Sequence, residues 1–139
     1  YCGTVTIGLS LASLSPQATV MGIEIVESAV RDAVANAQRN RLSNIRFRCG
    51  DSATAEAEGM HFDCIVIDPP RKGCSPAMIE ALVRLNPRRI VYVSCNPETL
   101  ARDLYTLSKG GYKVRRIQPV DMFPHTRHIE RVVFLLREK

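Results

Sequence analysis

The sequence predicts an α/β protein built on a mostly parallel, doubly wound sheet that closes with an antiparallel strand pair. Strand-like and helical segments alternate over the first 110 residues, an order that favours parallel strands joined by helices. The last two strand-like segments leave no room for a helix between them, so we expect them to pair antiparallel. With 139 residues, of which 45% are hydrophobic, the chain is long enough for one domain with one core.

The first half of the chain is expected to contain two strands and two helices. Its helices are predicted at residues 6–14 and 26–40, and its strands at residues 19–24 and 45–49. The second helix is the clearer of the two, because alanine and valine recur along it at helical spacing. Residues 1–8 resemble the turn that follows a first strand, so we expect that first strand to be missing from this sequence. Residues 52–59 predict a short helix only weakly.

The second half is expected to contain four strands and two helices. Its strands are predicted at residues 62–68, 90–94, 112–117 and 129–136, and its helices at residues 76–85 and 97–109. The strand over 62–68 is nearly continuously apolar, as a buried parallel strand should be. Ser75-Pro76 and Asn96-Pro97 each combine a capping residue with a proline at the first helical position. Gly110-Gly111 ends the last helix.

The five cysteines lie at positions 2, 49, 64, 74 and 95 and form no Cys-x-x-Cys pair. This spacing predicts no metal site, and the odd number fits reduced thiols in a cytoplasmic protein. No apolar run approaches the roughly 20 residues that a membrane span needs, and no signal-peptide pattern opens the chain. We therefore expect a cytoplasmic protein without a membrane or metal partner.

The net charge of +5 is concentrated near the C-terminus. Residues 1–100 hold 10 Lys/Arg and 10 Asp/Glu, whereas residues 101–139 hold 9 Lys/Arg and 4 Asp/Glu. A basic C-terminal third suits a polyanion such as nucleic acid. Charge alone fits a solvated surface equally well.

Four chemically useful side chains are expected at the carboxyl ends of strands: Glu24, Asp51, Asp68 and Cys95. In an open parallel sheet these ends line one edge, where ligands bind. Cys95 also precedes a helix N-terminus, whose partial positive charge favours a thiolate. An arbitrary cysteine is more often a small buried hydrophobe, and Asp51 equally suits a helix cap or a loop.

Four motifs together resemble one family. They are Tyr1-Cys2-Gly3, Asp68-Pro69-Pro70-Arg71-Lys72-Gly73, Ser94-Cys95-Asn96-Pro97, and the stretch from Asp121 to Glu130, DMFPHTRHIE. The chain resembles, over nearly its whole length, the catalytic domain of the S-adenosylmethionine-dependent RNA uracil-C5 methyltransferases. The resemblance implies a Rossmann-like class I methyltransferase fold, S-adenosylmethionine as cofactor and RNA as substrate.

The same resemblance implies a covalent mechanism. Cys95 corresponds to the nucleophile that adds to C6 of the uracil ring, which makes C5 reactive toward the methyl group. Glu130 corresponds to the general base that then removes the C5 proton. Without the preceding residues of its motif, Glu130 would be taken for an exposed strand carboxylate.

Further roles follow from the resemblance for the cofactor and the RNA. The residues expected to bind the cofactor are Tyr1, Gly3, Glu24, Asp51 and Asp68, with Glu24 on the ribose. Arg71 and Lys72 are expected to contact RNA phosphates, and Arg127 is expected to bind RNA. His125 is expected either to bind phosphate or to orient the loop. Access to C5 and C6 requires an unstacked base, so a looped or single-stranded uridine is expected.

The sequence departs from the family pattern in two respects. Val5 occupies the position of the second glycine of a Gly-x-Gly turn, where a β-branched side chain restricts the backbone. The N-terminal RNA-binding segments of the family are absent. We therefore expect residues 1–139 to form a single catalytic domain that is the C-terminal fragment of a longer enzyme. A methyltransferase for another RNA base, or a cofactor- or RNA-binding module without turnover, is the alternative, and the choice between transfer and ribosomal RNA stays open.

Overall fold

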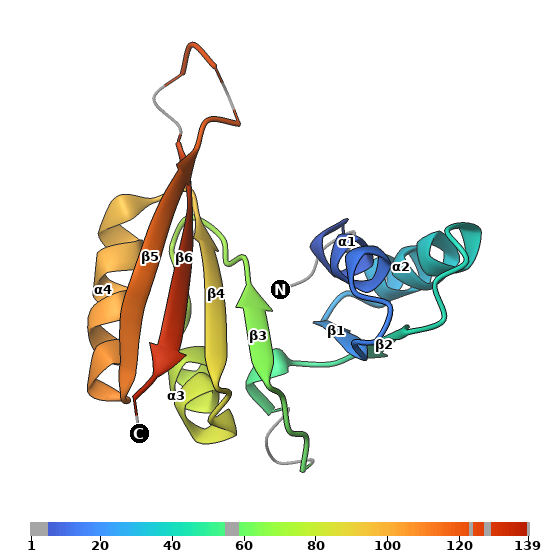
Figure 1. Cartoon of the computed structure of the whole chain (residues 1–139), viewed down its shortest axis with the longest axis horizontal. Coiled ribbons are helices and arrows are strands. Elements are labelled where there is room, and N and C mark those ends of the chain that lie inside the picture. The colour runs from blue at the N-terminus through green and yellow to red at the C-terminus, as the bar shows by residue number, and fades with distance from the viewer. Residues whose placement is uncertain (1–5, 55–58, 123, 127–128, 139) are drawn as a thin grey trace. The chain divides into compact units, whose positions relative to one another are not determined.

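The computed structural model describes residues 6–54, 59–122, 124–126 and 129–138. They belong to two compact units, residues 1–52 and 53–139, each with its own sheet (Figure 1). In chain order the elements are α1 (Thr6–Leu14), β1 (Val20–Glu24), α2 (Glu27–Arg39), β2 (Ile45–Cys49), β3 (Cys64–Ile67), α3 (Pro76–Leu85), β4 (Arg89–Ser94), α4 (Pro97–Lys109), β5 (Tyr112–Val120) and β6 (Glu130–Arg137). No helix within these described ranges is both long and apolar enough to cross a membrane.

The first unit is a two-stranded parallel sheet with two helices. β1 and β2 run in register from Val20 opposite Ile45 to Glu24 opposite Cys49. The core is small and rich in alanine, with Ala12 of α1 and Ala33 of α2 almost fully buried. Small side chains at these positions allow helices and strands to approach closely, although they bury little apolar area.

The second unit is a four-stranded mixed sheet in the order β3-β4-β6-β5. β3 and β4 are parallel, and β6 runs antiparallel to both of its neighbours. The antiparallel pairing of the last two strands is confirmed, but β6 also pairs with β4 and so lies between β4 and β5 (Figure 1). The predicted α/β fold of parallel strands with a closing antiparallel pair is confirmed, and the strands of the described residues are hydrogen-bonded in two sheets.

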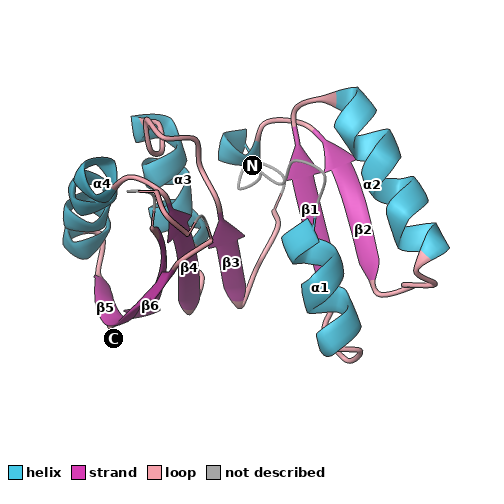
Figure 2. Ribbon diagram, turned by 90° about the horizontal axis from the view of Figure 1, so that it is seen from above, coloured by secondary structure: helices cyan, strands magenta, loops and turns pink. Residues whose placement is uncertain are grey.

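The core of the second unit lies between its sheet and the helices α3 and α4, which cover the same face (Figure 2). Side chains alternate along a strand, so every second residue of β4 points to this face. Ile90 and Tyr92 are fully buried there, opposite Leu135 and Val133 of β6. The intervening residues, such as Val93, point to the other face and are only half-buried.

The predicted helix starts are confirmed. The Ser75 hydroxyl accepts a hydrogen bond from Met78 N (3.2 Å), and Asn96 Oδ1 accepts one from Glu98 N (3.0 Å). In both helices a proline follows the cap, where its missing N–H leaves no hydrogen bond unmade. Of the weakly predicted helix at 52–59, residues 52–54 form a short 3₁₀ turn and residues 55–58 lie outside the described residues.

The packing of α3 predicts a large effect of Leu82→Ala. Leu82 is fully buried in the core of the second unit. Its truncation should lower the free energy of unfolding by about 2–5 kcal/mol, because the lost contacts and the cavity add up. Ile117→Ala, at a position 53% exposed, is the control and should change it by less than about 1 kcal/mol. Urea titration of both variants measures this, and equal losses would show that the core is placed wrongly.

Candidate active site

Cys95 lies in the turn that joins β4 to α4, and its side chain is half-buried. The turn is held from both sides of the cysteine. Ser94 Oγ accepts a hydrogen bond from Asn96 N (3.1 Å) and donates one to Asn96 O (3.0 Å). The thiol is therefore neither sealed in the core nor carried on a free loop, and it lies beside the N-terminus of a 13-residue helix as predicted.

Glu130 is the first residue of β6 and is also half-buried. The last pair of the β4–β6 ladder joins Ser94 to Arg131. Cys95 and Glu130 directly adjoin this pair, so both lie at the same end of the β4–β6 ladder. Cys95 itself is in the bend that follows β4, where the strand pairing has ended. Continuing the register by one residue predicts that Cys95 lies opposite Glu130, 35 positions away in sequence.

Asp68 lies at the same edge of this sheet. It directly follows β3, whose last residue, Ile67, pairs with Tyr92 of the parallel strand β4. Because both strands run in one direction, Asp68 and Cys95 leave the sheet at their carboxyl ends. Burial raises the pKa of the Asp68 carboxyl group above its usual value of 3.8, although part of the side chain remains exposed.

Glu24 and Asp51 share an edge of the other sheet. Glu24 ends β1, and its Oε1 accepts hydrogen bonds from Ile25 N (2.9 Å) and Val26 N (3.1 Å). The backbone thus fixes the carboxylate at the start of the turn into α2. Asp51 is exposed and follows β2 by two residues. Tyr1, Gly3 and Val5, which belong to the predicted cofactor loop, lie outside the described residues.

The predicted RNA-binding residues lie on two loops. Arg71 and Lys72 are exposed on the loop between β3 and α3. His125 is exposed and has a φ of +69° in the loop between β5 and β6, whereas Arg127 lies outside the described residues. In the described part of the chain, no group of three His, Cys, Asp or Glu residues could hold a metal ion.

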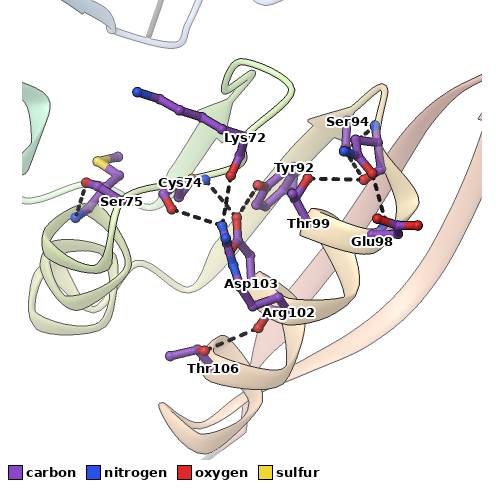
Figure 3. A network of polar contacts seen from close by, with 12 residues as sticks. Lys72, Cys74, Ser75, Tyr92, Ser94, Glu98, Thr99, Arg102, Asp103 and Thr106 are labelled. Atoms are coloured by element: carbon purple, nitrogen blue, oxygen red, sulfur yellow. Dashed lines mark hydrogen bonds and ion pairs between the residues drawn. The ribbon is translucent and has the colours of Figure 1, made fainter.

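A buried carboxylate that the sequence reading missed holds the β3–α3 loop against α4 (Figure 3). Asp103 of α4 is 2% exposed, and its Oδ2 accepts hydrogen bonds from Tyr92 OH (2.6 Å) and Cys74 N (2.8 Å). Its Oδ1 accepts one from Arg102 Nε (2.9 Å). Burying a carboxylate is costly unless it is hydrogen-bonded, and these donors come from a strand, a loop and a helix. The signal in the sequence was an acid on the apolar stripe of the helix 97–109.

The cysteines differ in thiol pKa, in exposure and in their position in the sheet. Burial raises the pKa of the Cys74 thiol to about 11, so Cys74 is protonated at neutral pH and is a poor nucleophile. Burial and the hydrogen bond to Asp103 raise the pKa of Tyr92, which therefore stays a donor. Cys49 and Cys64 are exposed, but Cys64 opens β3, at the opposite end of the sheet from Cys95.

Solved structures of known proteins share this fold. The magnesium protoporphyrin IX methyltransferase of Synechocystis PCC 6803, with bound S-adenosylmethionine, is 21% identical and covers 99% of this chain and 67% of its own at a TM-score of 0.76. The tRNA (uracil-54, C5)-methyltransferase of Pyrococcus abyssi, in complex with S-adenosyl-L-homocysteine, is 37% identical at a TM-score of 0.84. That match covers 98% of this chain and 33% of the other. The fold is therefore that of the class I, S-adenosylmethionine-dependent methyltransferases.

Matches to family models and to related proteins identify the family of this chain within the class I methyltransferases. The model of the tRNA (Uracil-5-)-methyltransferase family matches residues 53–138, and a general methyltransferase domain model matches residues 1–89. Relatives described as uncharacterised RNA methyltransferases are 48% identical in Bacillus cereus and in Enterococcus faecalis. Each of these matches covers 99% of this chain and 30% of the relative. The chain belongs to the tRNA (uracil-5-)-methyltransferase family, and it spans about a third of the length of the relatives it matches.

Replacement of Gly73 in the β3–α3 loop is predicted to lower the free energy of unfolding more than replacement of another glycine with a positive φ. Its φ is +77°, and a β-carbon there would lie 2.6 Å from Arg102 Nη2 and 2.7 Å from Asp103 Oδ2. Gly111 is a matched control, because its φ is +90° but a β-carbon would meet nothing within 4 Å.

Gly111→Ala should lower the free energy of unfolding by about 1–2 kcal/mol through backbone strain alone. Gly73→Ala should lower it by a further 1–3 kcal/mol or so, because it also disturbs hydrogen bonds to a buried carboxylate. Denaturant titrations measure the difference. Equal effects would mean that the loop does not pack on Arg102 and Asp103 as described.

Proposed function

We propose that this chain is the catalytic part of a longer enzyme that transfers a methyl group from S-adenosylmethionine to C5 of a uridine in RNA. The observation that supports the proposal is the β4–β6 register, whose last pair, Ser94 with Arg131, directly adjoins Cys95 and Glu130 in a chain of this family. The proposal includes a single catalytic domain over residues 1–139, C-terminal in the full-length enzyme. It leaves transfer and ribosomal RNA equally open.

Cys95 makes C5 of the uracil ring nucleophilic. Its thiolate adds to C6, and the electron pair of the C5–C6 double bond moves toward C5 and the O4 carbonyl to form an enolate. When bound, S-adenosylmethionine would supply an electrophilic methyl group to C5, and its methyl–sulfur bond would break to leave S-adenosylhomocysteine.

Glu130 completes the reaction. After methylation C5 carries both a methyl group and its original proton. The Glu130 carboxylate removes this proton, the C5–C6 double bond forms again, and the Cys95 thiolate leaves from C6. A carboxylate at the same end of the β4–β6 ladder as the thiol suits this step, because both groups must reach adjacent atoms of one ring.

The remaining predicted residues are assigned to binding. Glu24, Asp51 and Asp68, with Tyr1 and Gly3, are proposed to bind S-adenosylmethionine, and Glu24 is proposed to bind its ribose. Arg71, Lys72, His125 and Arg127 are proposed to contact RNA phosphates, which position the strand without reading its sequence. The target base must leave its stack to reach Cys95, so the proposed substrate is a uridine in a loop or a single strand.

RNA containing 5-fluorouridine tests the mechanism in the full-length enzyme. Fluorine at C5 cannot be removed as a proton, so the methylated adduct should remain attached to the protein and map to Cys95 by peptide mass spectrometry. Cys95→Ala should form no adduct and methylate uridine at least about a thousandfold more slowly, while it still binds S-adenosylmethionine in calorimetric titration. Cys64→Ala, which removes an exposed thiol at the other end of the sheet, should behave as the wild type.

Other outcomes decide against the proposal in different ways. Normal methylation by Cys95→Ala would exclude the covalent step. Methyl groups found on another base by nucleoside analysis would assign a different RNA substrate. Cofactor binding without methyl transfer to any RNA base would identify a module without turnover.

A further inference from the structure

The β3–α3 loop presents its charged side chains outward while α4 binds its backbone. Arg71 and Lys72 are exposed, and the Lys72 side chain extends away from the network (Figure 3). The carbonyl oxygen of Arg71 accepts hydrogen bonds from Asn96 Nδ2 (3.1 Å) and Thr99 Oγ1 (3.1 Å). A loop bound in this way loses little freedom when its side chains meet a ligand.

Arg102 binds the next part of the loop. Its Nη2 donates to Lys72 O (3.0 Å) and to Cys74 O (3.2 Å), and its Nε donates to Asp103 Oδ1 (2.9 Å). Asp103 in turn accepts from Cys74 N. The planar guanidinium is suited to this pattern because its donors have fixed directions, which the single ammonium of a lysine cannot reproduce. Carbonyl groups and an amide of the loop are thus tied to one face of α4.

The candidate nucleophile directly precedes the N-cap residue of the same helix. Asn96 follows Cys95 directly, caps α4 through Oδ1 and binds Arg71 O through Nδ2. One side chain therefore connects the turn of the thiol to the loop of the two cations. Thr99, Arg102 and Asp103 repeat the connection along the first two turns of the helix.

We infer that four residues, which we call the α4 bracket, hold Arg71 and Lys72 in a fixed position relative to Cys95. The α4 bracket consists of Asn96, Thr99, Arg102 and Asp103. RNA phosphates bound by the loop then bring the target base against the thiol. Arg102 is then a positioning residue: it acts on RNA through the loop backbone and touches no reacting atom. This inference rests on the proposed function, and specifically on phosphate binding by Arg71 and Lys72. It adds how that binding is coupled to the nucleophile.

A double-mutant cycle in the full-length enzyme separates positioning from direct contact. The cycle combines Arg102→Met with the loop variant R71A/K72A, and its readout is the dissociation constant for a uridine-containing RNA. The loop variant should weaken binding and reduce the salt dependence by about 1.4 in slope, since each phosphate contact to a single strand contributes about 0.7. Arg102→Met should weaken RNA binding about tenfold in the wild type but less than about twofold in the loop variant. The smaller effect is expected because Arg102 acts on RNA only through the two side chains that the loop variant lacks.

Two further variants test the mode of action. Arg102→Lys keeps the positive charge and should still show most of the loss, whereas direct phosphate binding by Arg102 would be largely rescued. Arg84→Met on α3 removes an arginine side chain of similar exposure, 51% against 56%, and should leave RNA binding unchanged. Independent losses from Arg102→Met and the loop variant, or rescue by Arg102→Lys, would overturn the inference.

Thr99→Val gives a second route if Arg102→Met does not fold. It is similar in shape and removes the hydroxyl that donates to Arg71 O (3.1 Å) and, at a longer distance, to Asn96 O (3.4 Å) within the turn of the helix. It should lower RNA affinity about threefold in the wild type and have no further effect in R71A/K72A. An equal loss in both backgrounds would also overturn the inference.

Amide hydrogen exchange gives a readout that needs no activity. The Cys74 amide, which donates to Asp103, should exchange at least about tenfold faster in Arg102→Met than in Arg84→Met. An unchanged exchange rate of the Cys74 amide would contradict the inferred role of the α4 bracket, even if the enzyme methylates uridine. Conversely, a wild type that methylates no uridine would refute the proposed function, while the binding cycle and the exchange rates still decide on the bracket.

Discussion

The antiparallel pairing of β4 with β6 is the constraint on which the candidate active site depends. Hydrogen bonds between Arg89–Ser94 and Glu130–Arg137 set which residue lies opposite which. A shift of one residue would turn every side chain of β6 to the other face, moving Val133 and Leu135 out of the core. The burial of these apolar side chains therefore fixes the register that ends with Ser94 opposite Arg131, next to Cys95 and Glu130. The proposed catalytic pair thus depends on core packing some way along the same strands.

The second constraint is the buried Asp103 carboxylate. Its partners come from β4, α4 and the β3–α3 loop, so a single charged group fixes three elements that carry proposed functional residues. Partial pairing would leave an unsatisfied charge, which is costly inside a protein. The same loop contains Gly73, whose φ of +77° and close approach to Asp103 leave no room for a β-carbon. The two constraints concern different proposed roles: the pairing with β6 concerns the proposed base Glu130, and the contacts of α4 concern the proposed RNA-binding residues Arg71 and Lys72.

Much of this arrangement could be predicted from local sequence signals. The caps Ser75 and Asn96 act within a few residues, and the structure confirms them. The buried strand predicted over 62–68 is present but shorter, Cys64–Ile67, and only Ile67 of it is buried. The position of β6 beside β4 could not be derived, because pairing between segments 35 residues apart leaves no local pattern. Asp103 was overlooked for a related reason: an acid on an apolar helical stripe is interpretable only once Tyr92 and Cys74 are known to meet it. Glu24 and Asp51 were correctly placed at the ends of their strands, and their roles remain proposals.

The alignment of Cys95 with Glu130 can be measured without cofactor or RNA. Glu130→Cys, under mild oxidation, should form a disulfide with Cys95, because directly opposite residues of an antiparallel pair have Cα atoms about 4.5–5.5 Å apart, within the range for a disulfide. Arg131→Cys is the control, since its side chain points to the other face, opposite Ser94. Peptide mapping should find Cys95 bonded to the thiol introduced at position 130 in the first variant, and no bond to Cys95 in the second. Crosslinking of position 131 instead of 130 would contradict the register, and with it the proposed site.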